Sequence, residues 1–285
     1  MEARVDGALY PPNGGPLNAQ AAHASGKIAA FHSGLAAVKF LAFDTATEWC
    51  SAALWVDGLC THAEIHAGQK HSDLLVPMLM KLLAESGFTL RQMDALVYGM
   101  GPGSFTGLRI ACGVAQGLAL GADLPVLGIS TLETLAEASA AEEGVGVSSE
   151  EVPEKVPEDV PHKVLACLDA RMNEVYVALY QRENVPHDSP VWRCLTGPLV
   201  CPPAAVPLPA VAGFIGVGSG FAAYPHIAEA CRLSRVDGGL IPHARAMARL
   251  AVPRLRRGEG MPAEHAEPLY IRDKVALKIC ERGLG

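Results

Sequence analysis

The sequence predicts an α/β protein with two lobes, each built on a mixed β-sheet. Strand-like apolar runs come first as a meander and then alternate with helix-like segments, a pattern typical of mixed sheets flanked by helices. An acidic segment punctuated by proline, residues 142–162, interrupts the pattern and predicts a linker or extended loop. The 285 residues suffice for two modest domains. We therefore expect an N-terminal lobe over residues 38–141, and a C-terminal lobe with a basic tail over residues 163–285.

The N-terminal lobe is expected to open with three strands. Residues 1–37 are rich in Ala, Gly and Pro and show little periodicity, which favours a poorly ordered extension or a start codon placed too early. Apolar runs of strand length follow at residues 38–43, 50–56 and 59–66. The last two flank Asp57-Gly58, a dipeptide typical of a tight hairpin, so we expect them to pair.

A helix and a short strand complete the first half of this lobe. Leucines and methionines recur at helical spacing over residues 72–85, which predicts an amphipathic helix with Pro77 in its early turns. Residues 95–98 predict a short strand that leads into a glycine-rich turn.

The turn and the helix after it, residues 101–121, are the most unusual stretch of the chain. Proline and glycine at its start force the chain to turn, and Ser104 or Thr106 can then cap a helix. Gly113, Gly117 and Gly121 recur on one face of that helix, where each costs about 1 kcal/mol relative to alanine. A stripe without side chains allows close approach, either by a partner or by the chain's own sheet.

The remaining elements alternate between strands and helices. A helix is expected to open at Ser130, because Glu133 completes the capping-box spacing. The other predicted elements are a strand at 125–129, a hairpin of strands at 163–169 and 174–180, a buried strand at 212–217, a basic helix at 243–257 and an extended piece at 268–271.

Charge and composition exclude some classes of protein. A net charge of −7 argues against nucleic-acid binding over the whole surface, although residues 231–285 carry eleven Lys/Arg against six Asp/Glu. Residues 110–122 are too few to span a membrane, and the N-terminus lacks the pattern of a secretory signal. The eight cysteines include no C-x-x-C pair, so we expect reduced thiols in a cytoplasmic protein.

Few residues suggest chemistry directly. Asp44, Thr45 and Thr47 follow the first strand, where they could meet a metal-bound phosphate, but local Asx- and ST-turn bonding explains them as well. The glycines of residues 216–220 resemble a phosphate or adenosine loop, whereas those of residues 101–107 fit no nucleotide fingerprint. His62 and His66 would lie about 13 Å apart in a strand, too far for one ion. We expect no catalytic residue, no metal and no cofactor.

Four motifs together resemble the bacterial TsaB (YeaZ) family over residues 38–276. They are His71-Ser72-x-x-Leu75-x-Pro77, Gly101-Pro-Gly-Ser-Phe-Thr-Gly-Leu-Arg109 with Ala115-Gln-Gly-Leu-Ala119, Asp169-Ala-Arg171-x-x-Glu174-Val-Tyr176, and Pro268-x-Tyr270-x-Arg272. The chain departs from the family at Ala46, where serine is usual. The resemblance implies a two-lobed, actin-like (ribonuclease H-like) ATPase fold and a role in forming threonylcarbamoyladenosine on tRNAs that read codons beginning with adenine.

The resemblance also implies partners. In that family TsaB is not the catalyst: it binds TsaD, which performs the transfer, meets TsaE through that complex, and forms a homodimer when TsaD is absent. Contact with tRNA is expected only through the complex, and no contact with a membrane is expected. Asp44, Thr45 and Thr47 then form a degenerate nucleotide loop. The residues implied in the partner interface are His71, Leu75, Met78, Leu79, Leu82, Phe105, Leu108, Arg109, Gly113 and Gly117.

Two alternatives stay open from the residues. The chain could be an enzyme in its own right, either an actin-fold ATPase or kinase or a metallopeptidase-like protein. Its basic C-terminal tail could also bind tRNA directly, which predicts salt-sensitive affinity.

Overall fold

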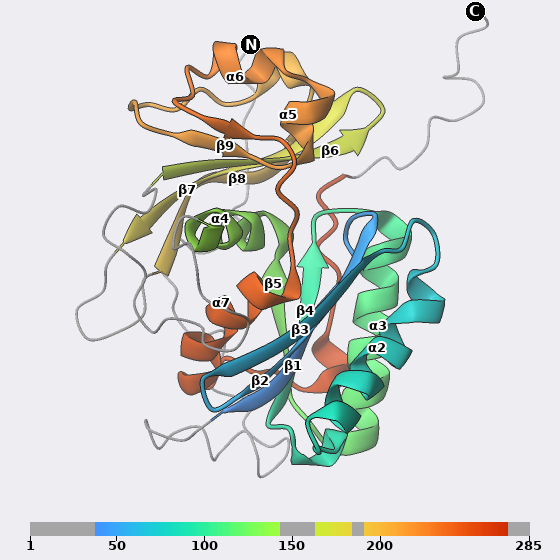
Figure 1. Ribbon diagram of the computed structural model, residues 1–285. Helices are drawn as coiled ribbons and strands as arrows, with labels where there is room; N and C mark the ends of the chain where they lie inside the picture. Colours follow the sequence, from blue (N-terminus) through green and yellow to red (C-terminus); the bar gives the residue numbers. More distant parts are fainter. Residues whose placement is uncertain (1–37, 143–162, 184–190, 273–285) are drawn as a thin grey trace, which may run out of the picture.

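The computed structural model describes residues 38–142, 163–183 and 191–272. The predicted extension at 1–37, nearly all of the linker at 142–162 and the end of the basic tail lie outside the described residues. Figure 1 shows two lobes stacked one above the other, each with its own sheet.

The first sheet has five strands in the order β3-β2-β1-β4-β5. Strands β1 to β3 form an antiparallel meander, while β4 and β5 run parallel to β1, so the sheet is mixed as predicted. Asp57 and Gly58 both adopt positive φ in the predicted hairpin. The strands are β1 (Lys39–Asp44), β2 (Trp49–Val56), β3 (Leu59–His66), β4 (Ala95–Gly101) and β5 (Val126–Ser130).

The second sheet repeats this plan in the order β10-β9-β6-β7-β8. Strands β6, β7 and β8 are antiparallel neighbours, and β9 and β10 add in parallel beside β6. The long edge strand β8 was not predicted, because glycine and proline break its apolar pattern. The strands are β6 (Lys163–Arg171), β7 (Glu174–Glu183), β8 (Val191–Cys201), β9 (Ile215–Val217) and β10 (Val236–Asp237).

Helices cover both faces of the first sheet. On one face α2 and α3 lie side by side and share a core with Leu41 and Phe43 of β1. On the other face α7 and α4 pack against Phe40 and Ala42 of the same strand. The α-helices are α2 (His71–Glu85), α3 (Phe105–Ala122), α4 (Thr131–Glu142), α5 (Ser219–Ala223), α6 (His226–Ala230) and α7 (Ala244–Arg256), and the short 3-10 helices are η1 (Leu90–Gln92), η2 (Pro203–Ala205) and η3 (Ala263–His265).

The chain crosses between the lobes more often than the sequence suggested. Helix α7 follows the second sheet in the chain but packs on the first sheet. The two sheets therefore lie on either side of residues 142–162 in the chain, but the helices that cover them do not. Helix α4 lies between the sheets and contacts both. Residues 261–272 then return along the first lobe, from a bridge between Met261 and Val126 to an ion pair of Arg272 with Glu174 in the second lobe.

The capping box predicted at the start of α4 is wrong. The Ser130 hydroxyl has no hydrogen-bond partner among the described residues, and Glu133 binds Arg254 of α7 instead. The requirement to pair the buried carboxylate of Glu133 outweighs a local cap here.

Helix α3 is long and apolar enough, by length and composition alone, to cross a membrane. It packs on β4, and its buried residues belong to the core of the first lobe. We therefore interpret α3 as a helix of the globular fold.

Candidate functional site

The glycine-rich turn before α3 is held against the end of β1. The amide of Ser104 donates to the Ala46 carbonyl at 2.7 Å, and the Thr45 hydroxyl donates to the Gly107 carbonyl at the same distance. A Cβ atom on Gly103 would lie 2.4 Å from the Ala46 carbonyl oxygen, and only glycine permits this approach of two backbones. Ser104 is the N-cap of α3, one of the two predicted residues. The turn therefore fixes α3 on the sheet.

The predicted nucleotide loop is used mainly for this packing. Asp44 and Thr45 are buried, and the Asp44 carboxylate accepts the Ala46 amide at 2.8 Å in an Asx turn. Burial raises the pKa of Asp44 to about 7. Thr47 accepts the Trp49 amide at 3.2 Å. The prediction of a nucleotide loop is thus wrong for Asp44 and Thr45, because their buried side chains cannot contact a phosphate. Of the three residues, Thr47 alone lines the cleft between the lobes.

The glycines of α3 face outward. Gly113, Gly117 and Gly121 are exposed, and a Cβ atom added to any of them would meet nothing within 4 Å. Packing of this stripe against the chain's own sheet, one of the two interpretations of the sequence, is therefore excluded for these glycines. Exposed Leu120 lies beside the stripe and Phe105 before it, and exposed Val76 and Met80 lie on the neighbouring α2.

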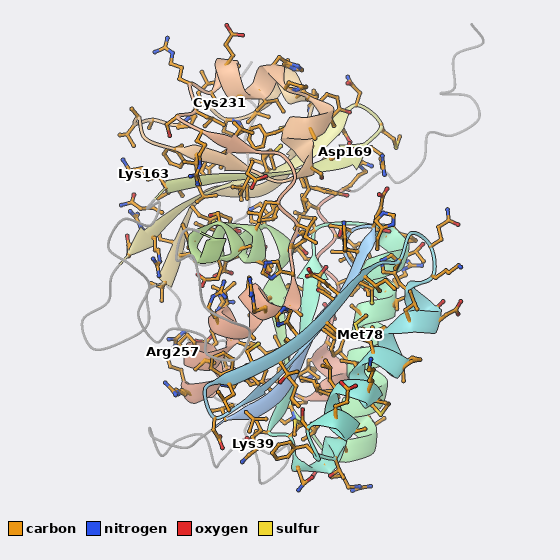
Figure 2. All side chains as sticks on the ribbon, in the orientation of Figure 1. Lys39, Met78, Lys163, Asp169, Cys231 and Arg257 are labelled. Carbon is orange, nitrogen blue, oxygen red and sulfur yellow. The ribbon has the colours of Figure 1, made fainter. Side chains whose placement is uncertain are left out.

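The predicted interface residues fall into two groups. Met78 is half-buried on α2 (Figure 2), and Phe105, Arg109, Gly113 and Gly117 are exposed. The other five lie inside the fold: His71, Leu75, Leu79, Leu82 and Leu108 are all buried. The prediction is corrected for the four leucines, because their side chains fill the core beneath the surface and cannot contact a partner directly.

Arg109 joins the exposed face of α3 to the returning segment. Its guanidinium lies 3.7 Å from the centre of the Phe105 ring, and its Nε donates to the Tyr270 hydroxyl at 2.9 Å. The two aromatic rings are 5.6 Å apart. The family motifs imply Arg109 in the interface but do not identify its partner Tyr270, which is 161 residues away in the chain.

A cleft of about 970 Å³ separates the lobes. Arg171, at the β6–β7 turn, reaches across it to Glu48 in the first lobe at 2.8 Å, and Arg272 donates to Glu174 at 2.5 Å. Buried His71 also lines the cleft, and its Nε2 has no partner among the described residues. Arg171 and Glu48 thus form an exposed ion pair that joins the two lobes.

The second glycine loop also serves packing. A Cβ atom on Gly218 would lie 2.5 Å from the Cys167 carbonyl oxygen, and one on Gly220 would lie 2.3 Å from the Cys167 sulfur. Ser219 accepts the Asp169 amide at 3.2 Å. The glycines of residues 216–220 therefore bring α5 against β6, which is sufficient reason for their presence without a bound phosphate or adenosine.

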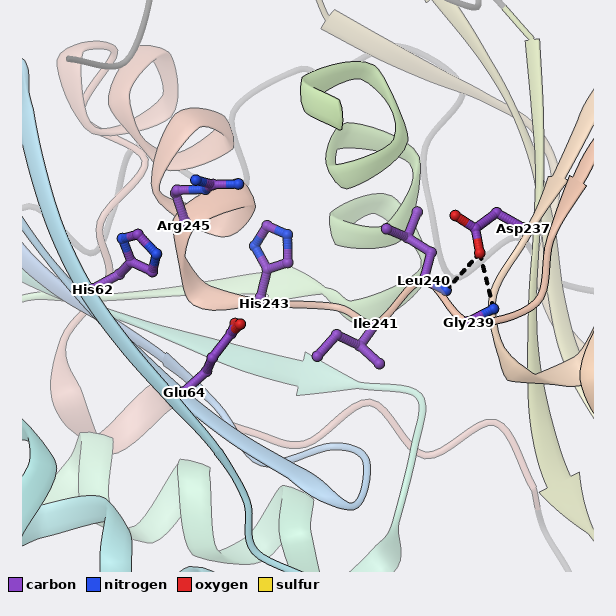
Figure 3. A pocket seen from close by; sticks show the side chains of 8 residues that line it. All are labelled: His62, Glu64, Asp237, Gly239, Leu240, Ile241, His243 and Arg245. Carbon is purple, nitrogen blue, oxygen red and sulfur yellow. Dashed lines mark hydrogen bonds between the residues drawn. The ribbon is translucent and has the colours of Figure 1, made fainter. Parts of the chain in front are cut away.

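A smaller polar pocket of about 250 Å³ lies between β3 and the segment before α7 (Figure 3). His62 and Glu64 enter it from β3, and His243 and Arg245 from the start of α7. Burial lowers the pKa of His243 to about 3, with help from nearby Arg245 and Arg249. His243 is neutral as a result, and its Nδ1 accepts the Ala246 amide at 3.3 Å. His66 does not line this pocket, and its Nε2 lies 3.5 Å from a carboxylate oxygen of Glu48.

Comparisons with known proteins point to the biosynthesis of threonylcarbamoyladenosine in tRNA. The chain is 39% identical over 246 residues to the "tRNA threonylcarbamoyladenosine biosynthesis protein TsaB" of Escherichia coli. The match covers 85% of this chain and 97% of the relative. The protein of the same name from Haemophilus influenzae is 39% identical and covers 84% and 95%. The family described as "TsaD: tRNA N6-adenosine threonylcarbamoyltransferase" matches residues 64–195.

Solved structures give the same result. "YeaZ from Pseudomonas aeruginosa" is 36% identical and covers 82% of this chain and 99% of its own, with a TM-score of 0.68. A second structure, titled as an uncharacterized protein "with similarity to peptidase YEAZ" from the same organism, is also 36% identical, with a TM-score of 0.70, and covers 82% and 100%.

Proposed function

The chain belongs to the TsaB family of tRNA threonylcarbamoyladenosine biosynthesis proteins, and from this membership we propose that it is a non-catalytic subunit that binds and activates TsaD. Its fold is the two-lobed actin-like fold of the YeaZ structures, as the sequence motifs implied. The modification is N6-threonylcarbamoyladenosine in tRNAs that read codons beginning with adenine. The subunit acts in the cytoplasm and meets TsaE and tRNA through the complex with TsaD.

The exposed glycine stripe of α3 carries this proposal. Each glycine inside a helix costs about 1 kcal/mol relative to alanine, and nothing within the described chain uses the space that Gly113, Gly117 and Gly121 leave open. Such a stripe allows a second helix to approach its backbone closely, and exposed apolar residues surround it. The surface fits a protein partner that covers it, and the same surface joins two copies of the chain when TsaD is absent.

The cleft supports a subunit without its own catalysis. Asp44 and Thr45 are buried in the packing of the glycine turn, so the first-strand loop offers no pair of accessible acid and hydroxyl groups to a metal-bound phosphate. No group of three metal-ligating side chains that could hold an ion occurs within residues 38–142, 163–183 and 191–272. In the proposed complex, TsaD performs the transfer, as the resemblance to the family implies.

A bulky side chain in the stripe tests the proposal. Gly117→Leu fills open space on the exposed helix face, so we expect the chain to fold normally and to lose co-purification with TsaD from its own organism. Ala230→Leu places the same leucine side chain on exposed α6 in the other lobe and is the matched control. A Gly117→Leu chain that still co-purified with TsaD would contradict the assignment of the surface.

A reconstituted reaction tests the role itself. Threonylcarbamoylation of tRNA by TsaD, TsaE and TsaC, the enzyme that makes the threonylcarbamoyl-adenylate in this family, should require this chain. Tight binding of ATP by the isolated chain in calorimetry, or a stoichiometric metal, would favour an independent enzyme instead. Salt-sensitive binding of tRNA by the isolated chain would favour a direct role for its basic C-terminal tail.

A further inference from the structure

Arg109 stands at one end of the glycine stripe. Arg109, Gly113 and Gly117 follow one another at intervals of four residues, and Gly121 continues the row, so all four share one face of α3. Twelve residues of helix extend for about 18 Å. A segment lying along the open glycine positions would therefore meet the Arg109 guanidinium where the row begins.

The guanidinium is held in place before any partner arrives. The Phe105 ring lies beneath it at 3.7 Å, and the Tyr270 hydroxyl accepts from its Nε at 2.9 Å. The Tyr270 backbone is itself fixed from both sides, since Leu269 donates to the Met100 carbonyl at 2.7 Å and Arg272 pairs with Glu174. An arginine that is already ordered loses less side-chain entropy when it binds.

The terminal nitrogens of Arg109 remain available. Arg171, Arg249 and Arg272 each pair with a carboxylate. Arg109 makes no ion pair within the part of the chain that the structure describes, and its hydrogen bond to Tyr270 uses Nε. The planar fork of Nη1 and Nη2 is thus exposed and matches the geometry of a carboxylate, which accepts two parallel N–H bonds.

We propose that Arg109 is the anchor for a side-chain carboxylate of the protein that covers the glycine stripe, and that Phe105 and Tyr270 position Arg109. This inference rests on the proposed function and names the chemistry that the partner must offer. A phosphate of RNA is the less favoured source, because the rest of the row is glycine, and a nucleic acid needs several cations along its track. Arginine and tyrosine are also the side chains that dominate the energetics of protein interfaces.

Affinity measurements on the complex with TsaD test the proposal. We expect Arg109→Ala to weaken binding 10- to 100-fold. Arg109→Lys should weaken it nearly as much, because lysine keeps the charge but loses the planar fork and its stacking on Phe105. Tyr270→Phe should weaken binding a few-fold, since it removes the acceptor that orients the fork. Arg193→Ala, an exposed arginine on β8 in the other lobe, is the control and should bind as the parent does.

A charge exchange identifies the carboxylate. Arg109→Glu should abolish binding, and exchange of one Asp or Glu of TsaD for Arg should restore it. If the parent chain bound TsaD and Arg109→Ala and Arg109→Lys bound equally well, the inference would be overturned while the proposed function stood. Failure of the parent chain to bind would instead overturn the proposed function. If no acidic residue of TsaD rescued Arg109→Glu, or if Arg109→Ala weakened binding of tRNA to the isolated chain, a carboxylate would not be the ligand.

Discussion

A Cβ atom on Gly107 would lie 1.9 Å from the carbonyl oxygen of Thr45, while the Thr45 hydroxyl donates to the Gly107 carbonyl at 2.7 Å. The turn at the end of β1 and the first turn of α3 therefore meet backbone to backbone. This contact distinguishes the glycines that the fold requires from those that it leaves exposed.

Gly107→Ala should destabilise the protein by about 2–3 kcal/mol, because the added methyl group must displace backbone atoms. Gly113→Ala is the matched control on the same helix. Its methyl group enters open space, and alanine favours helix, so we expect stabilisation of about 0.5–1 kcal/mol. Urea unfolding of both variants at one protein concentration measures the two free energies. Similar values for the two would show that Gly107 is not a close contact.

Glu137→Ala should destabilise the protein by about 3–5 kcal/mol, because it leaves a largely buried arginine without its partner. Glu137 of α4 accepts from Arg249 of α7 at 2.7 Å and from the Trp192 indole at 2.9 Å. Glu85→Ala breaks an exposed pair with Lys81 on α2 and should change the free energy of unfolding by less than about 0.5 kcal/mol. Thermal or urea unfolding measures both effects. A small effect at Glu137 would contradict the contribution to stability predicted for its contacts with Arg249 and Trp192.

Asp44→Asn should become more stable than the parent as pH rises from about 4 to about 7. Burial raises the pKa of Asp44 from 3.8 to about 7, so in this window the folded parent holds a proton that the unfolded chain has released. The stability that Asp44 contributes at low pH is therefore lost as pH rises, by at most about 4 kcal/mol. Asparagine keeps the acceptor for the Ala46 amide. Urea unfolding at pH 4.5 and 7.5 measures the change, and a constant difference between the two proteins would refute it.

His243→Asn should reduce the loss of stability on acidification. The pKa of His243 falls from 6.5 to about 3 in the folded protein, so between these values the unfolded chain binds a proton that the folded one does not. The parent should lose about 2 kcal/mol from this group between pH 7 and pH 5. Asparagine can still cap α7. The difference between parent and variant, followed by urea unfolding, isolates His243, and equal pH profiles would contradict the assignment.

Local patterns predicted most elements of the fold. Apolar runs of strand length and the Asp57-Gly58 turn located β1 to β3, and helical spacing located α2. The basic helix α7 was also predicted, and all of these bounds hold to within a residue or two. Strand β8 was not predicted because glycine and proline break its apolar pattern, and β10 was not predicted because two residues give no periodicity. The motifs also identified the family correctly, since they depend on residue identity along the chain and not on contacts between distant segments.

The candidate site was predicted less completely. Helical periodicity indicates that one face of α2 is buried, but it does not say whether a partner or the chain's own core covers that face. The family resemblance placed Leu75, Leu79 and Leu82 in a partner interface, although the first lobe buries them. Tyr270 could not be connected with Arg109, because only the return of the chain after α7 brings the two together.

The sequence by itself determined most of the elements, their order and the family, because each depends on residues that are neighbours in the chain. Only the tertiary structure decided what each glycine does. Gly103 and Gly107 allow two backbones to touch, whereas Gly113, Gly117 and Gly121 face open space. The physical reason is that a missing side chain looks the same in a sequence whether it makes room for the protein's own backbone or leaves room for another molecule, and only the surrounding atoms distinguish the two.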